Sequence, residues 1–431
     1  MFFSHFSLGL RKVKPLVCDS SSTRHGWPHL FEFFLLYCLY MNFTTNRHHR
    51  ALPAKHRFPG QHKLVEKISV IDPTLLILLA VIIVFGLIML SSASAILSYK
   101  NNQGDSYYYL KHQIIFGVLI GGLAFYIMSK IDYHYWRRHA FWIVVGTIIL
   151  LLAVFIPGLG SEFLGAKRWI DIGGFVFQPS EVVKLSFLIY LSAWLEKKGK
   201  EVADLHYGLI SFLVMLGFLV LFIAVAQKDL GTTMVIAVIS VVVYFIAGAP
   251  WKHLGLLMLG GVVSFLGLVK IAAHRVDRLT TFFNPQADLQ GIGYHVYQAL
   301  IAIGSGGFFG VGLGHSMQKK LSYLPAVMTD SIFAVIAEEL GFLFSIFLVI
   351  LFFGLVWRIL LIAKKAPDQF GRLLAVGIAT WIGFQAFVNI GAMLALLPLT
   401  GIPLPFISYG SSSMIMLLAA MGLVANISKK I

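Results

Sequence analysis

Six ionisable side chains lie inside or directly beside long apolar runs, where a charge is expensive and therefore a functional candidate. They are Glu181, Lys184, Asp229, Asp330, Glu338 and Glu339. Along a helix, the step from Asp330 to Glu338 rises about 12 Å, whereas a two-carboxylate glycosidase needs about 5–9.5 Å between its carboxyl groups. Asp330 is therefore expected to act as a single carboxylate that accepts a proton from a reacting group.

The segment before Asp330 carries four cationic residues. They are Arg275, Arg278, Lys319 and Lys320. Because guanidinium and ammonium groups bind anionic oxygens, this pattern predicts a site that holds an anionic lipid head group beside a proton acceptor. No P-loop, HExxH or Gly-x-Ser-x-Gly motif is present, so ATP hydrolysis, zinc proteolysis and serine hydrolysis have no support.

Four of these candidates also have a purely structural interpretation. Glu181 and Lys184 are three residues apart, so on one helix face they could simply neutralise each other. Asp229 and Asp330 each precede an apolar run, and either could cap the helix that follows. The residues alone leave both interpretations open.

The elements that must position these side chains are expected to be transmembrane helices. Of the 431 residues, 58% are hydrophobic and 12% are charged, against about 25% charged in soluble proteins. A span needs about 20 apolar residues. Runs of about this length occur at 74–97, 111–129, 139–157, 180–196, 207–226, 230–249, 252–272, 333–362, 372–397 and 405–427. The composition therefore predicts an all-α polytopic integral membrane protein with about ten transmembrane helices.

The distribution of basic residues orients these spans. Most of the 34 Lys and Arg residues fall in segments that are cytoplasmic if both termini are cytoplasmic, which also explains the net charge of +15 without nucleic acid. Residues 1–67 are predicted to be a basic, disordered cytoplasmic tail, and residues 68–431 a membrane domain. Two long extracytoplasmic loops are expected, at 158–179 and, between spans seven and eight, at 273–332.

Several motifs in this membrane domain resemble, in the same order, those of the FtsW/RodA/SpoVE (SEDS) family. The matches include Arg168-Trp169-Ile170, Gln178 to Lys184, Asp229 to Gly231, Gln298 to Gly307, Thr329 to Gly341, Asn389 to Gly391 and Pro398 to Gly410. They cover roughly residues 70–430. Departures include Ala326 in place of a glutamate and Ser331 in place of an aromatic residue.

The resemblance implies a peptidoglycan glycosyltransferase of the division-type FtsW branch, which polymerises lipid II at the outer face of the cytoplasmic membrane, at the septum. It implies a class B penicillin-binding transpeptidase, other division proteins and membrane lipids as partners. The family's essential aspartate falls on Asp330, the predicted general base of an inverting transfer. The predicted substrate-binding residues are Arg168, Lys184, Asp229, Arg275, Arg278 and Lys319.

Other functions stay open at this level. A divalent cation, Mg or Mn, would suit the leaving diphosphate, but no ligand cluster specifies one, so no cofactor or metal site is assigned. A lipid II flippase that uses Glu181, Lys184 and Asp229 is one alternative. A RodA-like elongation enzyme that controls cell shape and a non-catalytic scaffold are the others.

Overall fold

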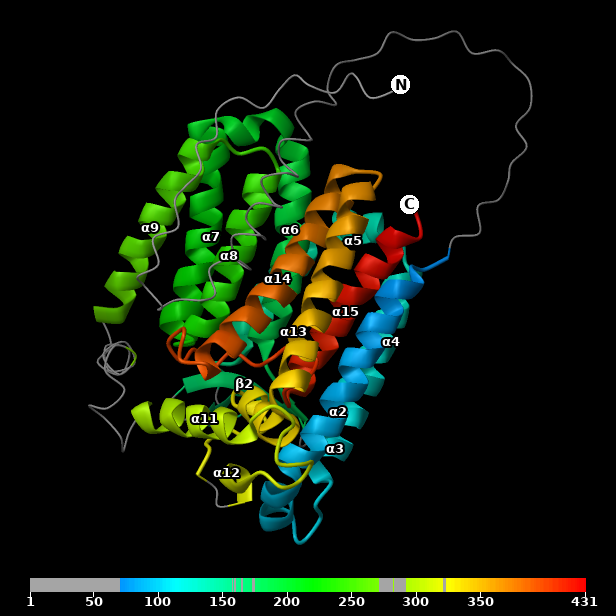
Figure 1. Ribbon diagram of the computed structural model, residues 1–431. Helices are drawn as coiled ribbons and strands as arrows, with labels where there is room; N and C mark the ends of the chain where they lie inside the picture. The colour runs from blue at the N-terminus through cyan, green and yellow to red at the C-terminus, as the bar shows by residue number, and fades with distance from the viewer. Residues whose placement is uncertain are drawn as a thin grey trace, which may run out of the picture. The chain divides into compact units, whose positions relative to one another are not determined.

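The computed structural model describes residues 70–431 except 157, 159, 164–165, 173–174, 271–281, 283–291 and 321–322. The predicted tail at 1–67 and the predicted ligands Arg275 and Arg278 lie outside the described residues. The described part is a bundle of long helices with a small sheet and short helices at one end (Figure 1).

Helices occupy each of the ten predicted apolar runs. The first five are α2 (Pro73–Asn101), the rod α3–η1–α4 (Tyr108–His112, Gln113–Leu119, Ile120–Lys130), α5 (Tyr133–Ala153), α6 (Pro179–Lys198) and η3–α7–η4 (Leu205–Ile210, Ser211–Leu221, Phe222–Ala226). The next five are α8 (Leu230–Ile246), α9 (Trp251–Lys270), α13 (Ile332–Lys365), α14 (Gln369–Met393) and α15 (Ser411–Ser428). A short 3₁₀ helix, η2 (Gly199–Ala203), follows α6.

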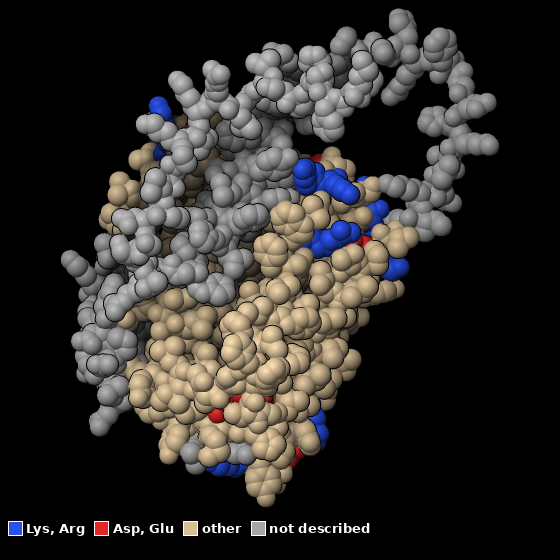
Figure 2. Space-filling model, viewed as in Figure 1, with Lys and Arg blue, Asp and Glu red and all other residues tan. Residues whose placement is uncertain are grey.

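Among the described residues, seven of these helical segments are long and apolar enough to cross a membrane. The polytopic helical fold is thereby confirmed, while a count of ten spans stays a prediction. On the face drawn in Figure 2, charged side chains gather toward the two ends, and the band between them is almost entirely uncharged. Such a band is what a bilayer requires of the surface that it contacts.

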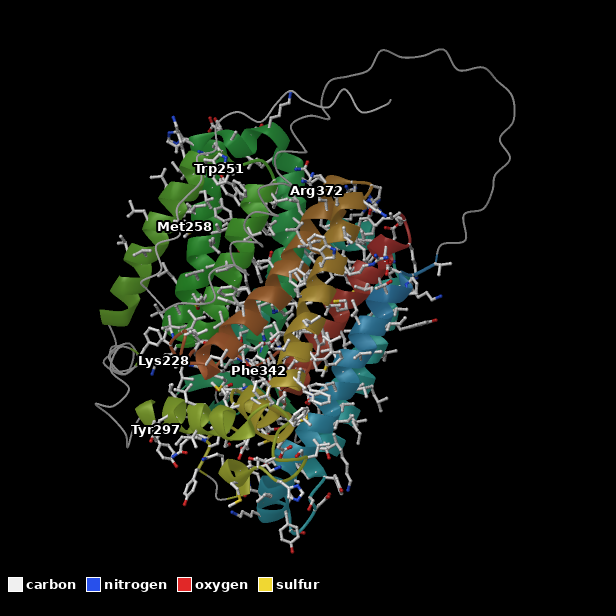
Figure 3. The ribbon with its side chains drawn as sticks, in the orientation of Figure 1. Lys228, Trp251, Met258, Tyr297, Phe342 and Arg372 are labelled. Carbon is white, nitrogen blue, oxygen red and sulfur yellow. The ribbon has the colours of Figure 1, made fainter. Side chains whose placement is uncertain are left out.

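The two ends of the bundle carry different parts of the chain. Figure 3 shows Lys228, Tyr297 and Phe342 toward one end, and Trp251 and Arg372 toward the other. The first end bears α11 (Ile292–Gly306), which lies across the helices, and the short α12 (Met317–Lys320). We call this the loop end.

The all-α prediction is wrong for the loop at 158–179. Its described residues form an antiparallel sheet of order β1-β2-β3, with β1 at Gly160–Phe163, β2 at Ala166–Ile172 and β3 at Phe175–Phe177. In β2, Ile170 is buried while its neighbour Asp171 is exposed, which is the two-residue alternation of a half-buried strand. Strands this short carry no long apolar run, so the pattern that predicts membrane spans does not reveal them.

Helix α13 is interrupted at Gly341, where φ is 76° and ψ is −170°. The amides of Phe342 and Leu343 donate to the carbonyls of Gly307 and Phe308 instead of continuing the helix pattern, at 2.9 and 3.3 Å. The glycine-rich loop after α11 thus wraps the break. The break leaves a half-helix, 332–340, that begins two residues after Asp330.

Candidate functional site

Asp330 lies at the loop end, in the short segment that leads into α13. Ser331 is the N-cap residue of α13, and its side chain makes no capping hydrogen bond. The N-cap position that the sequence suggested for Asp330 thus falls one residue later, and Asp330 precedes it. The side chain of Asp330 is half-buried, and a Cβ placed on Gly401 would lie 3.7 Å from its Oδ2 atom.

The loop between α14 and α15 brings Asp330 close to the start of α8. A Cβ on Gly231 would lie 3.1 Å from the Thr400 carbonyl oxygen and 3.6 Å from Asp229 Oδ1. Residues 400–402 therefore separate the start of α8 from Asp330. The sequence could not show this proximity, because the three segments are far apart along the chain.

Arg168 joins the sheet to the same region. Its Nε donates to the Gln227 carbonyl at 2.9 Å, and its Nη2 donates to the Lys228 carbonyl at 2.6 Å. Because the guanidinium is a rigid fork, it fixes the turn that precedes α8. Arg168 is half-buried, and it is the predicted cation that the structure brings to the neighbourhood of Asp229.

Asp229 is the N-cap of α8. Its Oδ1 accepts from the Thr232 amide at 3.0 Å, and its Oδ2 accepts from the Thr232 hydroxyl at 2.9 Å. Gln178 Nε2 also donates to Oδ2, at 3.4 Å. Both carboxylate oxygens are thus used by the protein, and the structural interpretation accounts for this residue.

Glu181 and Lys184 neutralise each other in the interior. Lys184 Nζ lies 2.7 Å from Glu181 Oε1, and both side chains are almost fully buried. The ammonium also lies 5.0 Å from the ring centroid of Trp381 and 3.5 Å from Gln385 Oε1. Lys184 therefore belongs to the packing between α6 and α14, away from the surface of the loop end.

Lys319 is likewise held in a buried ion pair. Its Nζ lies 2.6 Å from Glu339 Oε1 and donates to the Ser92 hydroxyl at 3.1 Å. Glu338 accepts a hydrogen bond from the Ser316 hydroxyl. These two carboxylates tie α12 and the end of α2 to the half-helix that follows Asp330.

Among the described residues, no group of three or more His, Cys, Asp and Glu side chains could hold a metal ion. The described part of the loop end therefore offers a half-buried carboxylate, Asp330, and a half-buried cation, Arg168, which binds the turn that precedes α8. Such a carboxylate suits proton abstraction, and such a cation suits an anionic group.

Sequence reasoning missed Asn389 and Ser408 as site residues. Asn389 Nδ2 donates to the Asp330 carbonyl at 2.9 Å, and Ser408 Oγ donates to the Thr329 carbonyl at 2.5 Å. Both residues fall within the motif matches at Asn389 to Gly391 and Pro398 to Gly410. A polar side chain within an apolar run is costly unless it is hydrogen-bonded, which is the signal that could have identified them.

The many long apolar helices define a multi-pass membrane protein. Residues 73–431 match the FtsW/RodA/SpoVE family, described as cell cycle proteins. The chain belongs to this family, which confirms the predicted resemblance.

Two relatives illustrate the similarity. Stage V sporulation protein E of Bacillus subtilis strain 168 is 40% identical over 359 residues, 83% of this chain and 97% of that protein. The probable peptidoglycan glycosyltransferase FtsW of Geobacter sp. strain M18 is 38% identical over 364 residues, 83% of this chain and 97% of that protein. The second name agrees with the predicted enzyme class.

Solved structures show the same fold. The crystal structure of the rod shape determining protein RodA of Thermus thermophilus matches with a TM-score of 0.60 and 29% identity, covering 84% of this chain and 97% of that one. A chain from a peptidoglycan synthase complex, described as coordinating polymerization and crosslinking, matches with a TM-score of 0.67 and 28% identity. It covers 84% of this chain and 98% of its own.

Proposed function

We propose that this protein is a peptidoglycan glycosyltransferase that polymerises lipid II at the outer face of the cytoplasmic membrane. Relatives that match over 97% and 93% of their own length are named probable peptidoglycan glycosyltransferases. The observation that carries the catalytic assignment is the position of Asp330: its half-buried carboxylate lies at the loop end, one residue before the N-cap of α13.

In the proposed reaction, Asp330 accepts the proton of the GlcNAc 4-hydroxyl of the acceptor. The oxygen attacks C1 of the donor MurNAc as the bond from C1 to the diphosphate oxygen breaks, and undecaprenyl diphosphate leaves with inversion at C1. A base within hydrogen-bonding reach of the hydroxyl contributes about 10²–10⁴-fold to the rate. The carboxylic acid then returns its proton to water.

The departing diphosphate needs positive charge beside it. We assign Arg168 to this role because it is half-buried and binds the turn that precedes α8, and we keep Arg275 and Arg278 as proposed partners. Lys319 and Lys184 are removed from this set because buried carboxylates already pair with them. Asp229 is assigned to helix capping.

The proposal includes ten spans with both termini cytoplasmic, so that the loop end faces outward. A class B penicillin-binding transpeptidase is the proposed partner, since a similar chain was solved within a synthase complex that coordinates polymerization and crosslinking. We propose the division septum as the site of action, with FtsW-named relatives as support. A sporulation relative makes spore envelope synthesis the second candidate.

The test uses purified protein and lipid II in detergent. Asp330→Asn is expected to bind lipid II but to make no glycan, whereas Asp105→Asn, which changes an exposed carboxylate that pairs with Lys111, should polymerise normally. Normal polymerisation by Asp330→Asn would refute the base assignment. Because detergent provides no second leaflet, a glycan ladder from the wild type also argues against the flippase alternative.

A further inference from the structure

The segment that carries Asp330 is held by three hydrogen bonds from another part of the chain. The carbonyls of three successive residues, 328–330, each accept from a different donor in α14 or in the loop after it. The donors are the Tyr409 amide to Met328 at 2.8 Å, the Ser408 hydroxyl to Thr329 at 2.5 Å, and the Asn389 side-chain amide to Asp330 at 2.9 Å. We call these donors the cradle.

The cradle residues are themselves anchored. Ser408 Oγ also accepts from the Leu404 amide at 2.8 Å, and Asn389 Nδ2 also donates to the Ile402 carbonyl at 2.8 Å. The Tyr409 hydroxyl lies 3.1 Å from Nδ1 of His112, at the start of the second helical rod. The segment at 328–330 is therefore fixed against α14 and the loop that follows it, and this loop is in turn fixed to α3 through Tyr409.

The side-chain amide of Asn389 is buried, and its orientation is set by the two hydrogen bonds that its nitrogen donates. Asn389 is 2% exposed, and its Oδ1 has no hydrogen-bond partner. A buried acceptor without a partner is costly. The amide group nevertheless keeps both of its donor contacts, one to the Asp330 carbonyl and one to the Ile402 carbonyl.

The turn that leads into residues 328–330 is strained. Ala326 has a φ of 49°, in the left-handed region that side chains other than glycine adopt at a cost. Ser331 closes the turn from inside, because its hydroxyl donates to the Pro325 carbonyl at 2.7 Å. Strained backbone persists where surrounding contacts over-determine it, and the cradle supplies such contacts.

We propose that Asn389 and Ser408 are positioning residues, which aim the Asp330 carboxylate by fixing the backbone that carries it. The proposal depends on the proposed role of Asp330 as general base. Its physical reason is that reacting atoms must lie about 3–3.5 Å apart and a displacement of about 1 Å can cost about 10²-fold in rate. Neither side chain is required to contact substrate.

The test compares hydroxyl variants of Ser408 in the full chain with lipid II in detergent. Ser408→Ala is expected to lower kcat about 10- to 100-fold while KM and the melting temperature stay near wild type. Ser408→Thr keeps the hydroxyl and should recover most of kcat. Ser240→Ala is the matched control, since Ser240 is a fully buried hydroxyl that donates to Ile236 within α8 at 2.6 Å.

A second variant tests the other donor without changing side-chain size. Asn389→Asp removes both amide donors and should lower kcat with KM unchanged. Wild-type kcat in both Ser408→Ala and Asn389→Asp overturns the proposal, as does a rise in KM alone. Unfolding of Ser408→Ala, or an equal loss in Ser240→Ala, also overturns it by showing a general structural role. Normal polymerisation by Asp330→Asn would instead refute the base assignment on which this proposal depends.

Discussion

At the scale of single residues, some of the charged side chains that the sequence suggested as ligands are already paired with other residues of the protein. Lys184 and Lys319 each lie within 2.7 Å of a buried carboxylate oxygen. Removing one member of such a pair leaves an uncompensated buried charge, which typically costs about 3–5 kcal/mol. A loss of activity on mutating either lysine would therefore reflect loss of stability and would be no evidence of substrate binding.

Asp229 allows capping and substrate contact to be separated. Asparagine caps helices about as well as aspartate, whereas alanine costs about 0.5–2 kcal/mol. Because both carboxylate oxygens already accept hydrogen bonds from the protein, Asp229→Asn should keep both the melting temperature and the polymerisation rate near wild type. Asp229→Ala should lower the melting temperature.

Thermal unfolding and lipid II polymerisation of the two purified variants would check this prediction. An Asp229→Asn protein that is fully stable yet inactive would contradict it. That outcome would indicate that the negative charge of Asp229 contributes to substrate binding.

At the scale of elements, the decisive feature is the break in α13. With φ of 76° and ψ of −170°, Gly341 occupies a region that is essentially restricted to glycine. The break lets the loop after α11 approach the helix backbone closely, because a Cβ on Gly310 would lie 2.2 Å from the Glu339 carbonyl oxygen. The half-helix after Asp330 is thus set by glycines remote from it in sequence.

Gly341→Ala should disrupt this arrangement. Its Cβ would lie 2.3 Å from the Gly310 amide nitrogen, and we expect a loss of about 2–6 kcal/mol from backbone strain and overpacking together. Gly354→Ala is the matched control in the same helix, since its Cβ would meet only Leu78, at 3.8 Å. Denaturation in detergent would compare the two, and equal stability would contradict the prediction.

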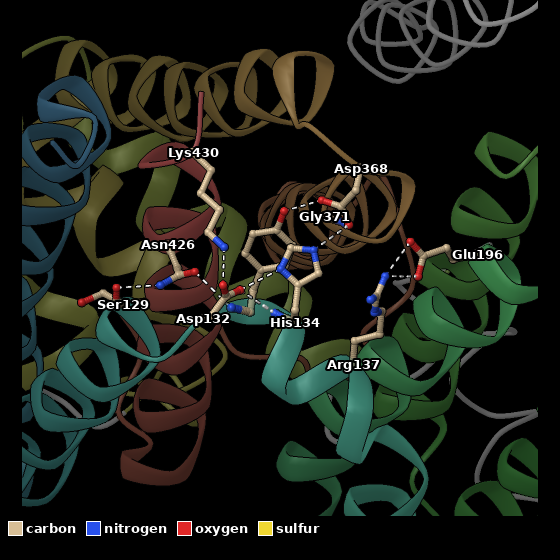
Figure 4. A network of polar contacts seen from close by, with 10 residues as sticks. Ser129, Asp132, His134, Arg137, Glu196, Asp368, Gly371, Asn426 and Lys430 are labelled. Carbon is tan, nitrogen blue, oxygen red and sulfur yellow. Dashed lines mark hydrogen bonds and ion pairs between the residues drawn. The ribbon is translucent and has the colours of Figure 1, made fainter. Parts of the chain in front are cut away.

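At the scale of the whole molecule, polar contacts join the helix ends opposite the loop end. Figure 4 shows Lys430 at the end of α15 beside Asp132, which precedes α5, and His134 reaching toward Asp368 at the start of α14. Arg358 of α13 donates to both carboxylate oxygens of Asp72. These contacts fasten helices that are adjacent in space and distant in sequence.

Asp72 makes this end sensitive to acid. Burial alone would raise its pKa, but hydrogen bonds from Arg358 and the Leu75 amide hold the pKa below the ordinary value of 3.8. A lowered folded-state pKa contributes stability above the unfolded value, and the contribution is lost as pH falls through the folded value. Asp72→Asn should therefore melt at a lower temperature than wild type at pH 7.

The difference in melting temperature between Asp72→Asn and wild type should shrink as pH falls below 3.8. Glu201→Gln is the control, because Glu201 forms an exposed pair with Lys198, and such pairs contribute about 0–1 kcal/mol. Melting curves in detergent across this pH range would check the prediction. A difference that is the same at every pH would contradict it.

The lengths of the apolar runs were enough to predict every long helix, because burying a backbone in lipid is a local demand on consecutive residues. The motif order was enough to identify the family and to single out Asp330. Neither could predict the sheet at 160–177, whose strands are too short to carry that signal, or the partner of Lys319. The pair Glu181–Lys184 and the cap at Asp229 are contacts between residues three apart, and the sequence already suggested both. Asn389 and Asp330, by contrast, are 59 positions apart. Their contact, like the loop around Gly341, depends on which donors and acceptors tertiary packing brings within 3 Å or so.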